Sequence, residues 1–225
     1  MIYFDKVSKR YGDTVALEDI TLSIAPKEFV SIVGHSGAGK TTLLKLLLAE
    51  ERPTDGGVFF ESIDLSDLPP ATLPHYRRKI GMVFQDFKLI PNKTAYENIA
   101  FAMEAVGRTD AEIRSDVPYI LELVNLADKA KHFPDQLSGG EKQRIAIGRA
   151  IINQPDLIIA DEPTGNLDPI NTYEVVEILK KINELGTTVL ITTHNKGVVD
   201  AIGRRVITID RGHLVRDDAE GKFVM

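Results

Sequence analysis

The residues with the clearest chemistry lie in a glycine-rich stretch, residues 34–41, which reads GHSGAGKT. It fits the G-x-x-x-x-G-K-[ST] pattern, in which backbone N–H groups surround phosphate oxygens. In that pattern Lys40 reaches the β- and γ-phosphates, and Thr41 offers its hydroxyl to Mg²⁺. An ordinary glycine-rich turn between a strand and a helix is the alternative. The predicted phosphate-binding residues are Gly34, His35, Ser36, Gly37, Ala38, Gly39, Lys40, Thr41 and Thr42.

Two adjacent carboxylates, Asp161 and Glu162, directly follow the apolar run 157–160. An aspartate at the end of a buried strand has the form of the Mg²⁺-organising residue of phosphate-loop nucleotidases. A second carboxylate beside it can polarise an attacking water. Taken alone, the pair could also be a strand end followed by a solvated turn, which Pro163 favours. With the glycine-rich stretch upstream, we predict a metal ligand at Asp161 and a catalytic base at Glu162.

Residues 137–143, with the sequence LSGGEKQ, join a serine, two glycines and a glutamate at an expected helix start. Ser138 and Glu141 have the spacing of a capping box, which accounts for them structurally. The two glycines Gly139 and Gly140 also expose N–H groups that can hold an anion. Since residues 34–41 already provide one phosphate site, this second one would be useful facing the nucleotide of another copy in a two-fold dimer.

The elements that position these residues alternate between strands and helices, which predicts a mostly parallel sheet around the phosphate loop. Capping boxes at Thr94 and Thr109, together with Ser138, predict helices between about residues 91 and 153. A further apolar face, built from Val175, Ile178, Leu179 and Ile182, predicts a helix after the paired carboxylates. The predicted strands are 2–7 and 16–24 as an antiparallel opening element, 29–33, 58–60, 80–84, 157–160, 187–192, and an edge hairpin over 206–209 and 214–215.

Composition limits the function classes. A chain of 225 residues, of which 43% are hydrophobic, can bury one large core with an inserted lobe. It has no cysteine, so disulfides and thiolate metal sites are excluded. No apolar run is long enough to span a bilayer and residues 1–6 lack a signal-peptide core, so we expect any membrane role to come through a partner. The net charge of −6 disfavours a nucleic-acid surface, and we interpret the basic triplet 77–79 as a solvated helix end.

Together, in this order, the motifs resemble the nucleotide-binding subunit of ATP-binding cassette (ABC) transporters over essentially the whole chain. The motifs that carry the resemblance are residues 34–42, Gln85, 137–143, 157–162, 166–168 and His194. The resemblance implies one ABC ATPase domain over 1–225. Its β subdomain and phosphate-loop core would occupy 1–90 and 154–225, and its helical signature subdomain 91–153.

The resemblance also implies roles for single residues. Tyr11 matches an aromatic that stacks on adenine, although a tyrosine in a core or hairpin is the alternative. Gln85 matches the glutamine that contacts Mg²⁺ and the attacking water. Asp168 matches an aspartate that contacts the second copy, and His194 matches the switch histidine at the γ-phosphate. Asn195 departs from the family's more usual aspartate.

Residues 161–168 (DEPTGNLD) narrow the resemblance to the branch that contains cell-division cassettes of the FtsE type, lipoprotein-release cassettes and macrolide-export cassettes. Residues 34–40, 77–86, 128–134 and 211–217 are most similar to the cell-division type. That implies ATP and Mg²⁺ as ligands, a head-to-tail dimer, and a peripheral position on the cytoplasmic face of the plasma membrane. The implied partner is an integral membrane protein of the FtsX type that regulates septal cell-wall hydrolases.

Three other functions share parts of these motifs. A lipoprotein or drug exporter cassette of the same branch has every catalytic residue. A DNA-repair or translation cassette is disfavoured because the chain has no long coiled coil between the loop and residues 137–143, no second cassette and no positive net charge. A nucleotide sensor without turnover is the third alternative.

Overall fold

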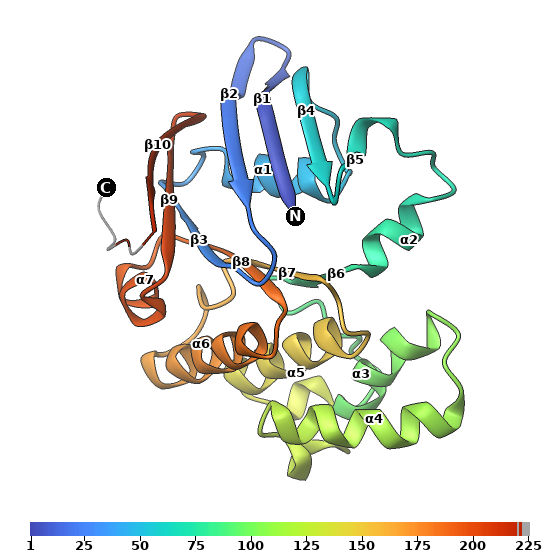
Figure 1. Cartoon of the computed structure of the whole chain (residues 1–225). Coiled ribbons are helices and arrows are strands. Elements are labelled where there is room, and N and C mark those ends of the chain that lie inside the picture. The colour runs from blue at the N-terminus through green and yellow to red at the C-terminus, as the bar shows by residue number, and fades with distance from the viewer. Residues whose placement is uncertain (220, 222–225) are drawn as a thin grey trace. The chain divides into compact units, whose positions relative to one another are not determined.

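We describe the protein from a computed structural model, which covers residues 1–219 and residue 221 (Figure 1). The chain divides into two compact units, and each is described by itself. The first comprises residues 1–77 with the chain from residue 188 onward, and the second comprises residues 78–187. The division predicted from sequence, at residues 91 and 153, stays a prediction, and the end of its 154–225 segment lies outside the described residues.

The first unit opens with an antiparallel sheet in the strand order β2-β1-β4-β5. Strand β1 (Ile2–Tyr11) pairs with both β2 (Thr14–Ile24) and β4 (Asp55–Phe60), and the short β5 (Ile63–Asp64) pairs with β4. Ile2 and Phe4 are buried while the residue between them is exposed. This alternation is typical of a sheet with one solvated face. The predicted antiparallel opening element is confirmed.

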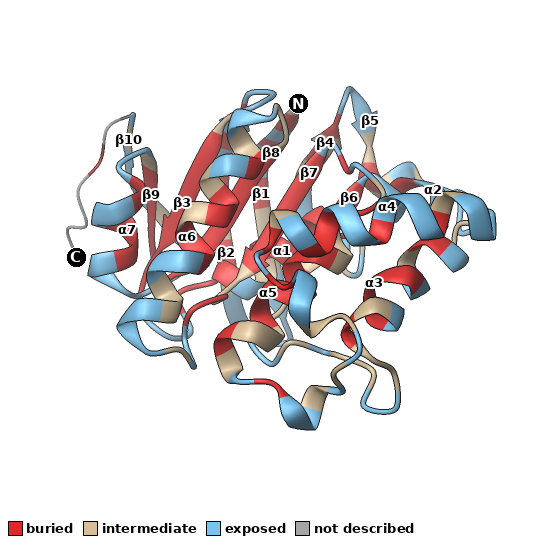
Figure 2. Ribbon diagram, turned by 90° about the horizontal axis from the view of Figure 1, so that it is seen from below, coloured by how far each residue is buried: buried red, intermediate tan, exposed pale blue. Residues whose placement is uncertain are grey.

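The remaining strands of the first unit lie in the order β10-β9-β3-β8. Strand β3 (Phe29–Val33) runs parallel to β8 (Thr188–Thr193) and to β9 (Arg205–Asp210), and β10 (His213–Asp218) is antiparallel to β9. Every residue of β3 and β8 is buried (red in Figure 2). Continuous apolar runs belong to strands covered on both faces. The predicted buried strands and edge hairpin are confirmed.

The helices of the first unit include α1 (Lys40–Leu47), α2 (Leu73–Arg78) and α7 (Lys196–Ile202). Side chains of helix α2 cap the C-terminus of α1, where backbone carbonyls lack intrahelical partners. The buried Tyr76 hydroxyl donates to the carbonyl of Leu47. The Arg77 guanidinium donates to the carbonyls of Leu48 and Ala49, each at 3.2 Å. The basic triplet predicted as a helix end does end a helix, and its first member also caps another one.

The second unit contains the parallel pair β6 (Ile80–Val83) and β7 (Leu157–Asp161) and four longer helices. These are α3 (Ala95–Glu104), α4 (Asp110–Leu123), α5 (Gly139–Ile151) and α6 (Pro169–Glu184). The capping boxes predicted at Thr94, Thr109 and Ser138 are all present. The four apolar residues predicted to form one face of α6 are all buried. Within residues 1–219 and 221, no helix has both the length and the apolar character that a membrane crossing requires.

Candidate functional site

The predicted phosphate loop connects β3 to α1 in the first unit. Glycine is required at both ends of it. An ideal Cβ on Gly34 would lie 2.2 Å from the carbonyl oxygen of Ile209. Gly39 has a φ of +112°, and a Cβ there would lie 2.7 Å from the carbonyl oxygen of Ala16. The glycines therefore let the loop backbone turn tightly between neighbouring strands, and within the turn the N–H of Ala38 donates to the carbonyl of His35 at 3.1 Å.

Lys40 is held inside this loop. Its side chain is buried, and the ammonium donates to the carbonyls of Gly34 at 2.7 Å and His35 at 3.1 Å. A buried cation held within a glycine-rich loop attracts an anion strongly, because little water screens it. Thr41, the next residue, is exposed and begins the surface of α1.

The start of α1 differs from the starts of five other helices that the structure describes. Helices α3, α4, α5, α6 and α7 each begin at a residue whose side chain accepts a hydrogen bond from the first turn. Helix α1 has no such side-chain cap at Gly39 and no acidic residue in its first turn. Its first N–H groups and the positive end of its dipole are therefore open to an anionic ligand such as a phosphate.

His194 lies next to the phosphate loop because of the β3–β8 register. Val33 pairs with Thr193, so Gly34 and His194 are the first residues beyond two paired parallel strands. Asn195, the departure from the family pattern, is the N-cap of α7, and its side-chain oxygen accepts from the backbone N–H of Gly197 at 2.9 Å. The amide thus supplies the capping oxygen at this position.

Tyr11 ends β1 with an exposed ring. The ammonium of Lys9 lies 4.9 Å from the centroid of that ring and also bonds to Glu51 at 2.9 Å. An exposed aromatic face is suited to stacking on a base. Its role in adenine binding stays a prediction.

In the second unit, Gln85, Asp161 and Glu162 meet at the carboxyl ends of β6 and β7. Asp161 is the last residue of β7, and Glu162 follows it with a positive φ of 46°. The side chain of Gln85 extends toward the same turn, since an ideal Cβ on Gly165 would lie 2.9 Å from its Nε2. The structure therefore brings together the three polar residues that the sequence predicts as ligands of metal and water.

Ser138 begins α5 in the second unit. Its hydroxyl oxygen accepts from the N–H of Glu141 at 3.2 Å, and its own N–H donates to the Glu141 carboxylate at 2.7 Å. The N–H of Ser138 donates to the Glu141 carboxylate and stabilises its charged form, so it lowers the pKa of the Glu141 carboxyl, and the Ser138 hydroxyl and Lys129 lower it further. Accepting one hydrogen bond leaves the hydroxyl proton of Ser138 able to donate to another group.

The comparisons with known proteins cover nearly the entire chain. A family model described as ABC transporter matches residues 17–165. The cell division ATP-binding protein FtsE of Bacillus subtilis is 50% identical over 99% of this chain and 98% of its own length. FtsE of Mycobacterium tuberculosis is 46% identical over 100% of this chain and 99% of its own, and FtsE of Escherichia coli is 43% identical over 95% and 97%.

Solved structures agree with the family model. A dimeric structure of the ATP-binding cassette MJ0796 in a post-hydrolysis state with ADP and Pi has a TM-score of 0.87 and 38% identity, over 99% of this chain and 100% of that one. This chain belongs to the ABC transporter ATP-binding family and is similar to its FtsE members. The ABC ATPase fold predicted from the sequence is confirmed, and the protein is an ATPase.

The donor atoms of the residues predicted as metal ligands in this ABC ATPase suit a magnesium ion. The predicted ligands are the Thr41 hydroxyl, the Gln85 amide and the Asp161 carboxylate. All of them offer oxygen atoms, which Mg²⁺ prefers, and nucleotide phosphates commonly complete its shell. Asp161 and Gln85 leave paired parallel strands at the same end, which is the required direction for shared ligands. These assignments stay predictions.

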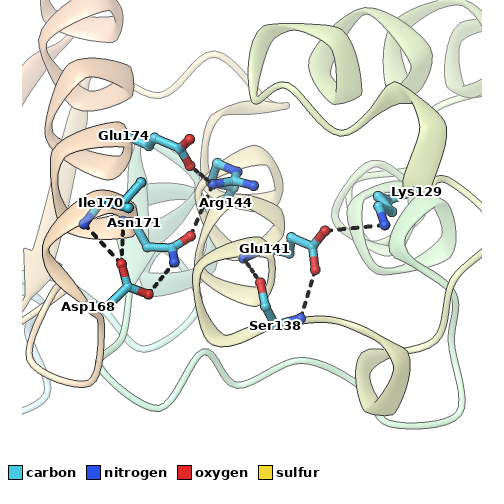
Figure 3. A network of polar contacts seen from close by, with 8 residues as sticks. All are labelled: Lys129, Ser138, Glu141, Arg144, Asp168, Ile170, Asn171 and Glu174. Atoms are coloured by element: carbon cyan, nitrogen blue, oxygen red, sulfur yellow. Dashed lines mark hydrogen bonds and ion pairs between the residues drawn. The ribbon is translucent and has the colours of Figure 1, made fainter.

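Asp168 caps α6 of the ABC ATPase, a role that sequence reasoning did not give it. One carboxylate oxygen accepts from the N–H groups of Ile170 at 2.9 Å and Asn171 at 3.0 Å, and the other accepts from the Asn171 side chain (Figure 3). The hydrogen bonds from Asn171 are the main reason that the pKa of Asp168 lies below its usual range. The sequence contained a signal for this cap, because an aspartate directly before a proline is a common helix start.

Sequence reasoning also missed Arg144 and Asn171, which connect α5 to α6. The Arg144 guanidinium bonds to Glu174 and approaches the Asn171 side-chain oxygen at 3.5 Å (Figure 3). Gly140 lies against the same asparagine, since an ideal Cβ there would be 1.7 Å from its Oδ1. The second glycine of the 137–143 motif is therefore required by helix packing as well as by any anion. No pattern within a single segment could have revealed this contact.

Proposed function

We propose that two copies of this ABC ATPase close head to tail over two Mg·ATP and that hydrolysis reopens them. The observation that carries the proposal is the likeness, over 99% of this chain, to a cassette seen as a dimer with ADP and Pi. Support from this chain comes from the uncapped start of α1 and the buried Lys40, which suit phosphate. A second support is Ser138, whose hydroxyl proton can donate to a phosphate of the other copy.

The proposed chemistry is in-line transfer of the γ-phosphoryl group to water. The new bond joins the water oxygen to the γ-phosphorus, and the bond from that phosphorus to the β–γ bridging oxygen breaks. Glu162 takes the proton of the attacking water, while Gln85 and His194 orient that water. Lys40 and the N–H groups of the loop stabilise the charge on the phosphate oxygens. Mg²⁺, when bound through Thr41, Gln85 and Asp161, neutralises phosphate charge.

The experiment compares two variants of the whole protein. Glu162→Gln should bind Mg·ATP, accumulate dimers in analytical ultracentrifugation and lose turnover by about 10²- to 10⁴-fold, the usual contribution of a general base. Lys40→Ala should bind nucleotide at least about tenfold more weakly, as expected for lost hydrogen bonds from a charged donor. Undiminished turnover of Glu162→Gln, or unchanged ATP affinity of Lys40→Ala, would remove the residue from its proposed role. The assays should include the membrane partner, because low basal activity of the isolated subunit would not decide.

We further propose that closure is transmitted to an integral membrane protein of the FtsX type, with the ATPase bound at the cytoplasmic face of the membrane. The support is the name that its relatives carry, cell division ATP-binding protein FtsE, at up to 50% identity in the examples given above. The proposed output is control of septal cell-wall hydrolases. Co-purification with the product of a neighbouring gene for a four-span membrane protein tests this. Recovery of a lipoprotein- or macrolide-type exporter subunit instead would replace the cell-division assignment.

A further inference from the structure

We propose that Asn171 is a positioning residue. It holds Asp168 and the start of α5 in fixed positions relative to each other, so that both can contact the second copy together. This rests on the proposed dimer and adds a residue to it. Asn171 is the point at which two separate helix starts meet. It follows Asp168 by three residues, and Figure 3 shows its side chain between Asp168 and Arg144. An ideal Cβ on Gly140 of α5 would lie 1.7 Å from its Oδ1.

The two ends of the Asn171 amide have different partners. Its Nδ2 donates to Asp168 Oδ2, while its Oδ1 faces Arg144 Nη1 at 3.5 Å. Helix capping alone would use only Asp168 Oδ1, which accepts from two backbone N–H groups. The additional bond to Oδ2 fixes the plane of an exposed carboxylate that would otherwise rotate. Asp168 is therefore presented in one orientation.

The contact between α5 and α6 involves about one turn of each helix. Gly140 and Arg144 are four residues apart on α5, and Asn171 and Glu174 are three apart on α6, so each pair lies on one helix face. The buried guanidinium of Arg144 bonds to the Glu174 carboxylate. Because the Glu174 side chain is 45% exposed, this ion pair is partly screened by water, and it links the two helices without being buried on both sides. Asn171 lies between that pair and Asp168.

Helix α5 begins with the capping box of Ser138. The Glu141 carboxylate that accepts from the Ser138 N–H also approaches the ammonium of Lys129 at 3.4 Å. Glu141 thus holds Ser138 through hydrogen bonds, and the contact of Gly140 with Asn171 places the same helix start against α6. Asn171 makes the positions of Ser138 and Asp168 depend on each other, which matters if both act on the partner copy.

The experiment uses an isosteric change in the full-length Glu162→Gln protein, in which the dimer should persist. Asn171→Asp keeps the size of the side chain and the oxygen that faces Arg144, but it replaces the donor to Asp168 by a second acceptor. We expect the dimer to dissociate at least about tenfold more readily at pH 7.5, as for one lost charge-assisted hydrogen bond. ATP affinity of the monomer should change by less than about twofold, because additivity holds for sites without shared partners.

A pH profile separates positioning from packing. Two carboxyl groups that share one site take up a proton more readily than a single one. Acidification to pH 5.5 should therefore restore dimerisation of Asn171→Asp, and it should not restore Asn171→Ala. Glu177→Gln, which removes a surface ion pair with Lys180 on the same helix, is the control and should dimerise like its parent. Full dimerisation of Asn171→Asp at pH 7.5 would overturn the proposal. Failure of the Glu162→Gln parent to dimerise with ATP would instead overturn the proposed function.

Discussion

Gln85 and Glu162 occupy equivalent positions on two paired parallel strands. Val83 of β6 pairs with Ala160 of β7, and each of the two polar residues lies two positions further along its chain. The backbone register therefore brings the amide and the carboxylate to the same end of the strand pair. The turn after β7 returns to this point, because Gly165 N–H donates to the Glu162 carbonyl at 3.1 Å.

The space beside Gly165 predicts a selective loss of turnover. In Gly165→Ala the new Cβ would meet Gln85 Nε2 at 2.9 Å, and the flexible end of that side chain would move away. Stability should change by less than about 0.5 kcal/mol, as for surface substitutions. Turnover should fall by up to about 10²-fold, since a displacement of about 1 Å can have that effect. Steady-state ATPase assays and thermal melts test this.

The control for this prediction is a double variant. If Gly165→Ala acts through Gln85, it should have no further effect on turnover in a protein that already carries Gln85→Ala. An additional loss of the same size in the double variant would show that Gly165 acts by another route.

The close approach of α5 and α6 predicts a loss of stability on adding one methyl group. Gly140→Ala would place its Cβ 1.7 Å from Asn171 Oδ1, so α6 or the side chain must shift. Overpacking of this kind costs about 1–3 kcal/mol. Adding Asn171→Ala should recover part of the loss, because the nearest atom is then the Asn171 Cβ at 2.7 Å. Urea unfolding of the single and the double variant measures the two losses of stability. An equal loss in both variants would contradict the steric explanation.

The capping of α1 by a side chain of α2 predicts that removing one hydroxyl group lowers the stability of the protein. Tyr76 is buried and donates to the Leu47 carbonyl, and burial raises the pKa of its phenol, which keeps it protonated. Tyr76→Phe leaves that carbonyl without this donor and should lower the free energy of unfolding by about 1 kcal/mol. Tyr119→Phe is the matched control, because Tyr119 is 61% exposed. Equal melting temperatures for the two variants would show that the Tyr76 hydrogen bond adds nothing.

The three capping boxes predict how stability depends on pH. Glu97, Glu112 and Glu141 each accept from the N–H of their N-cap residue, and this lowers each pKa below its usual value of 4.5. A depressed carboxyl pKa stabilises the folded state above the unfolded value, and the contribution is lost as the pH falls through the folded value. The free energy of unfolding should therefore decrease as the pH falls below about 4.5.

Replacing the three glutamates by glutamine tests this assignment. Glutamine keeps the geometry of the capping box and does not titrate, so the triple variant should show a flatter profile between pH 5 and pH 3. Glu104→Gln, at the exposed end of α3, should keep the slope of the wild type. A triple variant with the wild-type slope would show that other carboxylates cause the acid sensitivity.

The sequence predicted local structure well where one segment carries its own signal. The buried strands β3 and β8 followed from short runs rich in apolar and β-branched residues, and α3 to α5 followed from capping boxes. Helix α7 was missed, although Asn195 as a cap before Val198, Val199 and Ile202 could have indicated it. Of helix α2 only the end was predicted, from the basic triplet 77–79, because its single buried residue, Tyr76, gives no period.

Contacts between distant segments could not be predicted in the same way. The pairing of Val33 with Thr193 decides that His194 lies beside the phosphate loop, and neither segment encodes that register alone. The packing of Asn171 against Gly140 could not be predicted from one segment either, since each residue has an adequate local explanation. For these residues the resemblance to a family implies roles, and the structure shows the contacts that they make.

The uncapped start of α1 also has a consequence for the lifetime of the protein. A capping side chain cannot simply be introduced at Gly39, because its Cβ would collide with the Ala16 carbonyl at 2.7 Å. Without a bound anion, the first turn of α1 therefore lacks the stabilisation that a capping side chain gives to helices α3 to α7. Ligand that binds only the folded state shifts the balance away from unfolded chains. Copies without nucleotide should therefore be the first that proteases remove, so that starvation for ATP would lower the amount of the protein as well as its activity.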